Sequence, residues 1–172
     1  MREAQQLIHP LDPVWNQESR VLILGTMPSP ASRSVGFYYA HPRNRFWPTL
    51  ARVFDTTLPM TTAERRDFAL SHRIALWDVL HSCMISGASD ASIRDPVPND
   101  VAGLLRRAPI CAIATTGSTA ARLYRTYILP QTGIEAIALP STSPANCRPG
   151  TAERLIEAYG ILRLYCDPSA EA

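Results

Sequence analysis

Four short apolar runs recur along the chain, and helical patterns separate them. The first run, Val21 to Leu24, ends at Gly25, and the other three occupy residues 74–80, 110–114 and 134–139. Short runs that are apolar throughout are typical of parallel strands buried on both faces. Strands that alternate with helices predict a parallel sheet covered on both sides. We therefore expect an α/β fold with three layers, α/β/α, around a four-stranded parallel sheet.

Helices are expected at residues 46–54, 61–71, 99–107, 118–129 and 151–165. Asn44 precedes apolar positions spaced i, i+4, i+7 and i+8, so it can be the N-cap of the first helix. Thr61 and Glu64 match a capping box at the start of the second helix, and Asn99 can cap the third.

The rest of the chain lacks a clear period. We expect residues 1–20 to form an irregular lead-in, residues 81–98 a long polar loop, and residues 167–172 a tail. At 172 residues, with 46% of them hydrophobic, the chain is expected to be a single domain and a monomer. No stretch approaches the ~20 apolar residues of a membrane span, so we expect a cytoplasmic protein.

The charged and sulfur-containing residues exclude several kinds of chemistry. All 17 basic residues are Arg, so no lysine amine can form a Schiff base, and the net charge of +2 permits a polyanionic partner without requiring one. The four cysteines form no C-x-x-C pair and no cluster with zinc spacing. We expect no metal and no cofactor, and we expect Cys111 to lie in the core.

The unusual loops all follow the expected strands, at residues 26–44, 81–98, 115–117 and 140–149. Because the carboxyl ends of parallel strands share one edge of the sheet, these loops should meet there. The first loop combines three adjacent aromatic residues with a dense polar segment, which suits a pocket for a flat, hydrogen-bonding ligand. Walker, G-x-S-x-G, G-x-G-x-x-G and H-E-x-x-H motifs are missing.

Several blocks of residues are shared with a known family, and they occur in order along most of the chain. They are Leu24 to Ser29, Tyr38 to Trp47, Trp77 to Leu80, Ser89 to Ile93, Pro98 to Asp100 and Pro140 to Asn146. With these blocks the chain resembles the uracil-DNA glycosylase superfamily, most closely its hypoxanthine-DNA glycosylase branch. The resemblance implies a four-stranded parallel sheet flanked by helices, and a DNA substrate.

The resemblance also implies roles for individual residues. Asn44 corresponds to the catalytic amide of the branch, whose carbonyl oxygen holds a water molecule against the anomeric carbon. Met27 stands where many members have an acidic or amide residue that activates water. Tyr39 corresponds to the ring that stacks on the extruded base, although core packing is an alternative for it. The base-binding set is completed by Thr26, Met27, His41 and Thr116.

A second set of residues is expected to hold the DNA. The final loop resembles the segment that enters the minor groove and grips phosphates, and its residues are Ser141, Ser143, Pro144, Ala145 and Asn146. Phosphate contacts are expected from Arg33, Arg43, Arg45 and Arg148. His41 can contact a phosphate or the base edge, or it can fix the loop, and for Asp78 a buried anchor is preferred over a site role.

These expectations lead to a monofunctional DNA glycosylase that removes a deaminated base, with hypoxanthine as the first choice. One departure from the branch affects the choice of base, because Thr116 replaces an Asn that is common in relatives and so lacks the paired donor and acceptor of an amide. The alternatives are a uracil-directed or mismatch-directed glycosylase and a catalytically silent nucleic-acid-binding module.

Overall fold

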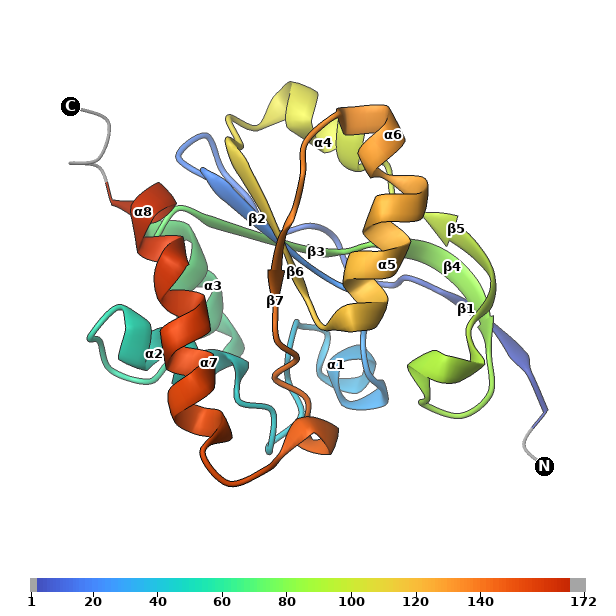
Figure 1. Cartoon of the computed structure of the whole chain (residues 1–172), viewed down its shortest axis with the longest axis horizontal. Helices are drawn as coiled ribbons and strands as arrows, with labels where there is room; N and C mark the ends of the chain where they lie inside the picture. Colours follow the sequence, from blue (N-terminus) through green and yellow to red (C-terminus); the bar gives the residue numbers. More distant parts are fainter. Residues whose placement is uncertain (1–2, 168–172) are drawn as a thin grey trace.

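The computed structural model describes residues 3–167 (Figure 1). The strands are β1 (Gln5–Ile8), β2 (Val21–Gly25), β3 (Ile74–Asp78), β4 (Leu80–Ile85), β5 (Arg94–Pro98), β6 (Ala112–Thr116) and β7 (Ile137–Leu139). The helices are α1 (Pro30–Val35), α2 (Phe46–Val53), α3 (Thr62–Ser71), α4 (Val101–Arg107), α5 (Ser118–Tyr127), α6 (Leu129–Thr132), α7 (Thr151–Tyr159) and α8 (Arg163–Cys166). Short 3-10 helices are η1 (Asp90–Ser92), η2 (Pro144–Asn146) and η3 (Gly160–Leu162).

Four strands form the central parallel sheet in the order β3-β2-β6-β7. The strand β2, which contains the first of the four apolar runs, lies inside this sheet and is buried along its whole length. Its last residue, Gly25, pairs with Asp78 at the end of β3. The predicted α/β/α architecture with a four-stranded parallel sheet is therefore confirmed.

The side chains of β2 alternate between the two faces of the sheet, as the period of a strand requires. Val21 and Ile23 belong to a core cluster with residues of α2, α3 and α7, whereas Leu22 and Leu24 pack with residues of α4 and α5. Figure 1 shows these two groups of helices on opposite sides of the sheet. Both faces are thus closed, and the carboxyl edge of the sheet carries the loops.

A second sheet was not expected. Strands β1, β4 and β5 form an antiparallel sheet in the order β1-β4-β5, at one side of the molecule (Figure 1). The prediction of a long polar loop at residues 81–98 was therefore wrong, and the prediction of an irregular lead-in was wrong at residues 5–8, which form β1. β1 is mostly exposed and β5 contains Pro96 and Pro98, so neither has the local pattern of a strand, and both depend on pairing with β4.

The lead-in also contacts the parallel sheet. Val14 forms an isolated antiparallel bridge with Leu76, through two backbone hydrogen bonds of 2.9 Å. The edge strand β3 is thereby partly covered, which protects its unpaired backbone groups. Of the expected tail, residues 168–172 lie outside the described part of the chain, as do residues 1–2 of the lead-in.

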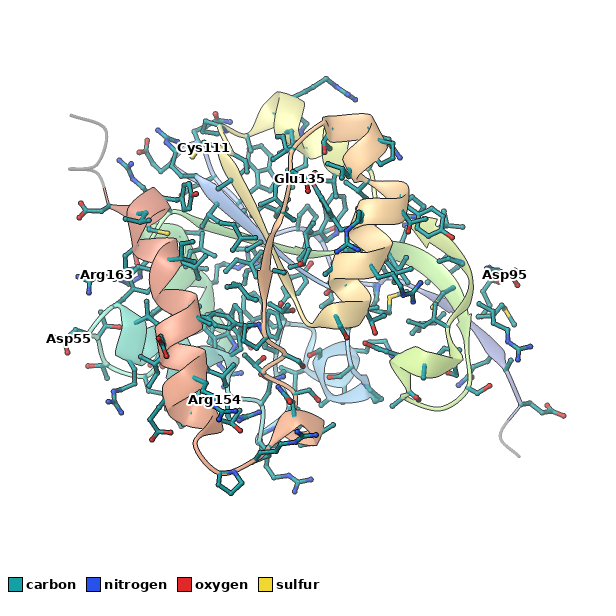
Figure 2. All side chains as sticks on the ribbon, viewed as in Figure 1. Asp55, Asp95, Cys111, Glu135, Arg154 and Arg163 are labelled. Atoms are coloured by element: carbon teal, nitrogen blue, oxygen red, sulfur yellow. The ribbon has the colours of Figure 1, made fainter. Side chains whose placement is uncertain are left out.

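Three local expectations need correction. Asp100, not Asn99, caps α4 by accepting the Gly103 N–H at 2.8 Å, while the buried Asn99 amide braces the backbone around β4. Cys111 is exposed rather than in the core, and Figure 2 places it at the surface. The helix expected at residues 151–165 is interrupted by η3 after Tyr159.

Within residues 3–167, no helix has the length and the apolar character needed to cross a membrane.

Candidate active site

A cavity of about 840 Å³ lies at the carboxyl edge of the parallel sheet. The segments that follow β2, β6 and β7 contribute to it, as the sequence predicted, and the fourth contribution comes from the connection between β4 and β5, with residues 88–91. Its lining includes eleven of the predicted site residues: Thr26, Met27, Tyr39, His41, Asn44, Thr116, Ser141, Ser143, Pro144, Ala145 and Asn146. Arg43 and Arg148 do not line the cavity and are exposed beside it.

The strand ends bring four groups together on the wall of the cavity nearest the sheet. These are Gly25 at the end of β2, Asp78 at the end of β3, Thr116 at the end of β6 and the hydroxyl of Tyr39. The Tyr39 hydroxyl lies 3.2 Å from Thr116 Oγ1. A Cβ atom on Gly25 would lie 2.5 Å from Asp78 Oδ1 and 3.4 Å from the Tyr39 hydroxyl, so only glycine leaves room for both groups here.

Tyr39 presents an aromatic ring to the cavity. Its ring stacks on Phe46 with a centroid distance of 3.7 Å and an interplanar angle of 10°, and it packs against the core cluster while the residue also lines the cavity. The backbone of Tyr39 has a φ of 53°, an uncommon conformation for a residue with a side chain. Burial, followed by the charge of Asp78, raises the pKa of Tyr39, so its hydroxyl stays protonated at neutral pH.

Asn44 combines a local structural bond with a place in the cavity. Its Oδ1 accepts the N–H of Phe46 at 2.9 Å, at the start of α2, and its side chain is half-buried. An amide oxygen has two lone pairs, so one remains for a water molecule or a substrate donor. The hydrogen bond also fixes the orientation of the carboxamide, because the Phe46 N–H needs an acceptor and only the amide oxygen, not the NH2 group, can accept it. The N-cap of α2 is Arg45, so the prediction that Asn44 caps this helix was one residue off, although Asn44 still accepts the first N–H of the helix. This structural bond is compatible with a chemical function.

His41 is held within the same loop. Its Nδ1 accepts the N–H of Arg43 at 3.1 Å, and its backbone oxygen accepts the N–H of Asn44 at 2.9 Å. In the neutral ring the proton therefore sits on Nε2, which is the nitrogen left for a ligand. Of the roles open to His41, fixing the loop is observed, and a donor contact to a ligand remains compatible with it.

The loop from Ser141 to Asn146 is braced by its own side chains. Ser141 Oγ accepts the N–H of Ser143 at 3.2 Å, and the Asn146 amide donates to the Ser141 carbonyl oxygen at 2.9 Å. Gly117, with a φ of 92°, approaches so closely that an added Cβ would lie 3.3 Å from the Cβ of Ser141. The backbone is thus presented in a fixed shape beside the cavity.

Arg45 connects two loops instead of projecting toward a ligand. Its guanidinium donates to the carbonyl oxygens of Ser143 and Asn146 at 3.1 and 2.9 Å, and its backbone N–H donates to Thr142 at 3.1 Å. The expected phosphate contact by Arg45 conflicts with these bonds. Arg33 lines the cavity while donating to the Pro28 carbonyl oxygen at 2.9 Å.

Two acidic residues that were not predicted to belong to the site line the cavity. Asp78 is buried, as the anchor interpretation required, but it also faces the cavity. Asp90 comes from η1, and the pKa of its carboxyl group is raised. Loss of solvent is the main cause and the charge of Asp78 adds to it, whereas a hydrogen bond from the Thr26 hydroxyl acts in the opposite direction. Both residues lie in sequence blocks that the chain shares with the family, and this resemblance was the signal that could have identified them as site residues.

Among residues 3–167, no group of three or more His, Cys, Asp or Glu residues is placed to hold a metal ion.

The fold and the cavity together define an α/β protein with a cavity at the carboxyl edge of a parallel sheet, and an aromatic ring and an amide are among the groups that line it. The model of the Uracil DNA glycosylase superfamily matches residues 13–163. The chain belongs to this superfamily.

Individual relatives agree with that membership. A protein from Methanosarcina acetivorans named hypoxanthine DNA glycosylase is 33% identical over 136 residues, which cover 78% of this chain and 85% of the relative. A protein of the same name from Methanosarcina barkeri is 32% identical over 137 residues, covering 79% and 86%. The solution NMR structure of a candidate uracil DNA glycosylase from M. acetivorans is similar at a TM-score of 0.77 and 27% identity, covering 92% of this chain and 99% of that one.

Proposed function

We propose that this protein is a monofunctional DNA glycosylase that hydrolyses the N-glycosidic bond of deoxyinosine in DNA and releases hypoxanthine. The observation that carries the proposal is the presence of Asn44 and Tyr39 on one cavity, whose volume of about 840 Å³ accommodates a purine. The family membership and the names of the two Methanosarcina relatives support the same activity. The expected cytoplasmic location is compatible with a DNA substrate.

The damaged nucleotide has to leave the base stack before it can enter the cavity. Inside, the base stacks on the face of the Tyr39 ring that Phe46 does not occupy. Loss of pairing costs less for a poorly paired base such as hypoxanthine, so extrusion itself contributes to selectivity.

Asn44 orients the nucleophile in this scheme. Its carbonyl oxygen, with one lone pair on the Phe46 N–H, uses the other to hold a water molecule at the anomeric carbon. The bond from C1′ to the base breaks, its electron pair goes to the base nitrogen, and water adds to C1′. That water releases one proton to solvent, and the base nitrogen takes up one proton, so the products are a sugar hydroxyl and neutral hypoxanthine. An amide is a weak base, so most of the rate enhancement has to come from stabilising the departing base and the oxocarbenium-like sugar.

Water is the expected nucleophile because the chain has no lysine. All 17 basic residues are Arg, and guanidinium groups do not form Schiff bases with the sugar. The product is therefore an intact abasic site rather than a cut strand.

The DNA backbone is proposed to lie along the loop from Ser141 to Asn146, whose small residues permit close approach. Arg43 and Arg148 are the proposed phosphate contacts, since both are exposed beside the cavity. Asn146 is proposed to support DNA binding indirectly, because its amide donates to the Ser141 carbonyl oxygen and so holds the shape of the loop.

The activity is tested with labelled duplexes that contain inosine, uracil or xanthine, incubated with the protein and then heated in alkali. Strand breaks in the inosine duplex after alkali, and none before it, are the expected result. Intact inosine strands after alkali would refute the proposal.

A second candidate is a uracil-directed or mismatch-directed glycosylase, because one observation weakens the case for hypoxanthine. The Thr116 hydroxyl, which replaces the branch's usual Asn, lies within hydrogen-bond distance of the Tyr39 hydroxyl and offers no amide to a base. Breakage confined to the uracil duplex would select this candidate. Breakage in none of the three duplexes, combined with DNA binding, would select a silent binding module, which Met27 favours because a thioether cannot orient water as a carboxylate does.

A further inference from the structure

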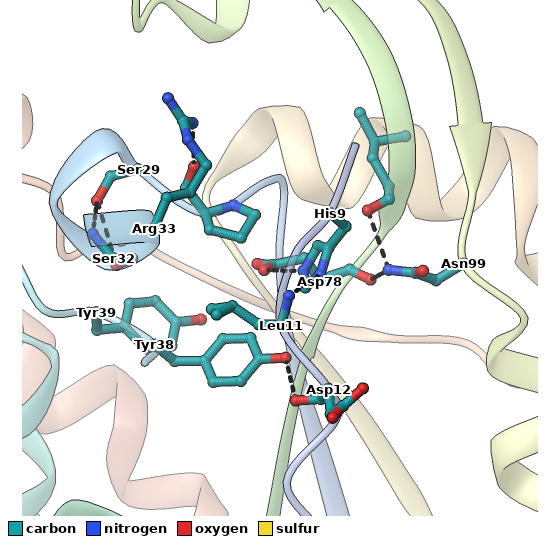
Figure 3. A network of polar contacts seen from close by, with 12 residues as sticks. His9, Leu11, Asp12, Ser29, Ser32, Arg33, Tyr38, Tyr39, Asp78 and Asn99 are labelled. Atoms are coloured by element: carbon teal, nitrogen blue, oxygen red, sulfur yellow. Dashed lines mark hydrogen bonds and ion pairs between the residues drawn. The ribbon is translucent and has the colours of Figure 1, made fainter. Parts of the chain in front are cut away.

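A buried histidine and aspartate form a pair behind the cavity, and the histidine lies outside the part of the chain matched by the family model. His9 Nε2 lies 2.7 Å from Asp78 Oδ2, and the two side chains are only 2% and 6% exposed. His9 follows β1 in the lead-in, whereas Asp78 ends β3, so the pair joins the lead-in to the parallel sheet (Figure 3).

The direction of this hydrogen bond is fixed by a second contact. His9 Nδ1 accepts the N–H of Leu11 at 3.2 Å, so that nitrogen carries no proton. The proton of the neutral ring is then on Nε2, and His9 donates to Asp78. Asp78 Oδ2 therefore has to be an acceptor in this arrangement.

The other oxygen of Asp78 is held toward the cavity. Oδ1 lies over Gly25, at 2.5 Å from the point where a Cβ would be, and both residues line the cavity. The Asn99 amide donates to the backbone oxygen of Asp78 at 2.9 Å and so fixes its backbone as well. The result is a carboxylate oxygen in a set position on the same side of Gly25 as the Tyr39 hydroxyl.

We propose that the His9–Asp78 pair selects bases that carry a ring N–H, by presenting an oxygen that can only accept a hydrogen bond. The inference rests on the proposed glycosylase function. Deamination of adenine turns N1 from an acceptor into an N–H donor, and deamination of cytosine does the same at N3. A carboxylate oxygen binds the N–H of hypoxanthine or uracil and repels the lone pair of adenine or cytosine.

The pair selects which base is bound, and it does not accelerate cleavage of the glycosidic bond. Negative charge develops on the base as it departs, and a carboxylate beside the ring opposes that charge. His9 is a positioning residue in this scheme, because it reaches the base only through Asp78.

The test uses Asp78→Asn and two substrates, duplexes with inosine or with unsubstituted purine, whose N1 has a lone pair and no hydrogen. His9 still donates in this variant, so the carbonyl oxygen of the new amide has to face His9, and its NH2 has to face the base. The ratio of single-turnover release rates, inosine over purine, should fall at least about tenfold from the wild-type ratio.

The double variant His9→Gln/Asp78→Asn provides the matched control. Glutamine offers an acceptor as well as a donor, so the second amide can turn and present its oxygen to the base again. The ratio should then move back toward the wild-type value. Circular-dichroism melting and binding to a duplex with an abasic site establish that each variant is folded.

Several outcomes would overturn the inference while leaving the glycosylase function intact. They are a wild-type ratio near one, equal losses on both substrates in Asp78→Asn, and no recovery in the folded double variant. The wild-type ratio needs no variant, so a folding failure does not block the test. Failure of the glycosylase function itself is a different result, namely no release from the inosine duplex by the wild-type protein.

Discussion

Asn44 serves two purposes with one carboxamide. Its oxygen accepts the Phe46 N–H at the start of α2, and the residue also lines the cavity that is proposed to take the base. Sequence spacing indicated the first purpose and the family resemblance the second. Because both purposes use the same oxygen, removal of the carboxamide should affect both, and stability and release report the two losses separately.

We predict that Asn44→Ala lowers hypoxanthine release at least about 100-fold, because no other group is proposed to orient the water. DNA affinity should stay close to wild type. Stability should fall by about 0.5–2 kcal/mol, since the bond to Phe46 is lost. Single-turnover release from an inosine duplex, fluorescence anisotropy and thermal melting measure the three effects.

Asn44→Asp is the matched control, since its carboxylate still accepts the Phe46 N–H and should restore the melting temperature. It should also retain more activity than Asn44→Ala, because it can still hold water. Wild-type release rates in Asn44→Ala would remove Asn44 from the chemistry and leave it only its bond to the Phe46 N–H.

Tyr39 allows stacking to be measured apart from hydrogen bonding. In an Asn44→Ala background, which prevents cleavage, Tyr39→Leu should weaken binding of an inosine duplex by about 1–3 kcal/mol through lost stacking. Tyr39→Phe loses only the contact between its hydroxyl and Thr116, so its effect should be smaller, about 0.5–1.5 kcal/mol. Both variants share the backbone strain at this position, which makes the comparison a fair one. Equal affinities for Leu and Phe would place Tyr39 among core residues instead.

At the scale of elements, the active-site loops are coupled rather than independent. Arg45 stands at the start of α2 and holds the carbonyl oxygens of Ser143 and Asn146, one loop away. The same two loops contain the proposed catalytic amide and the proposed DNA-gripping segment. Movement of one loop therefore shifts the other.

We predict that Arg45→Met speeds amide hydrogen exchange at residues 143–147 and lowers stability by about 1 kcal/mol for each lost bond. Release of hypoxanthine should slow, because the catalytic and gripping loops lose their common position. Hydrogen exchange measured by mass spectrometry reports the first effect directly. Arg148→Met, an exposed site just beyond the same loop, should leave the exchange pattern unchanged. Identical exchange in both variants would argue against the coupling.

At the scale of the whole molecule, the net charge of +2 is small, so DNA binding has to depend on where the arginines lie. We predict that the dissociation constant for an inosine duplex rises steeply between low and moderate salt. Replacing Arg43 or Arg148 with Gln should each reduce the slope of log K against log salt by about one. Anisotropy titrations at several salt concentrations measure the slope.

Arg163→Gln is the control for charge alone. Arg163 is exposed on α8, away from the cavity loops, so this variant changes the net charge by the same amount without removing a proposed phosphate contact (Figure 2). Its slope should match that of the wild-type protein. An affinity that does not change with salt would contradict the proposed electrostatic contacts.

The sequence by itself determined the features that depend on near neighbours. The apolar run of β2, the capping box of Thr61 and Glu64 in α3, and the alternation of strands with helices are all local patterns, and each is observed. Since parallel strands with helical connections place their carboxyl ends along one edge, the position of the cavity followed from the same patterns.

Only the tertiary structure decided the features that depend on distant partners. The three-stranded sheet joins β1 to β4, and the hydrogen bonds of the Arg45 guanidinium join the start of α2 to the loop from Ser141 to Asn146. His9 contacts Asp78, although the two are 69 positions apart in the sequence. No residue in these contacts has a distinctive local pattern, because each contact gains its stability from a partner that only the folded chain brings near. The sequence therefore indicated what kind of site this protein has, and the packing of distant segments decided how that site is held.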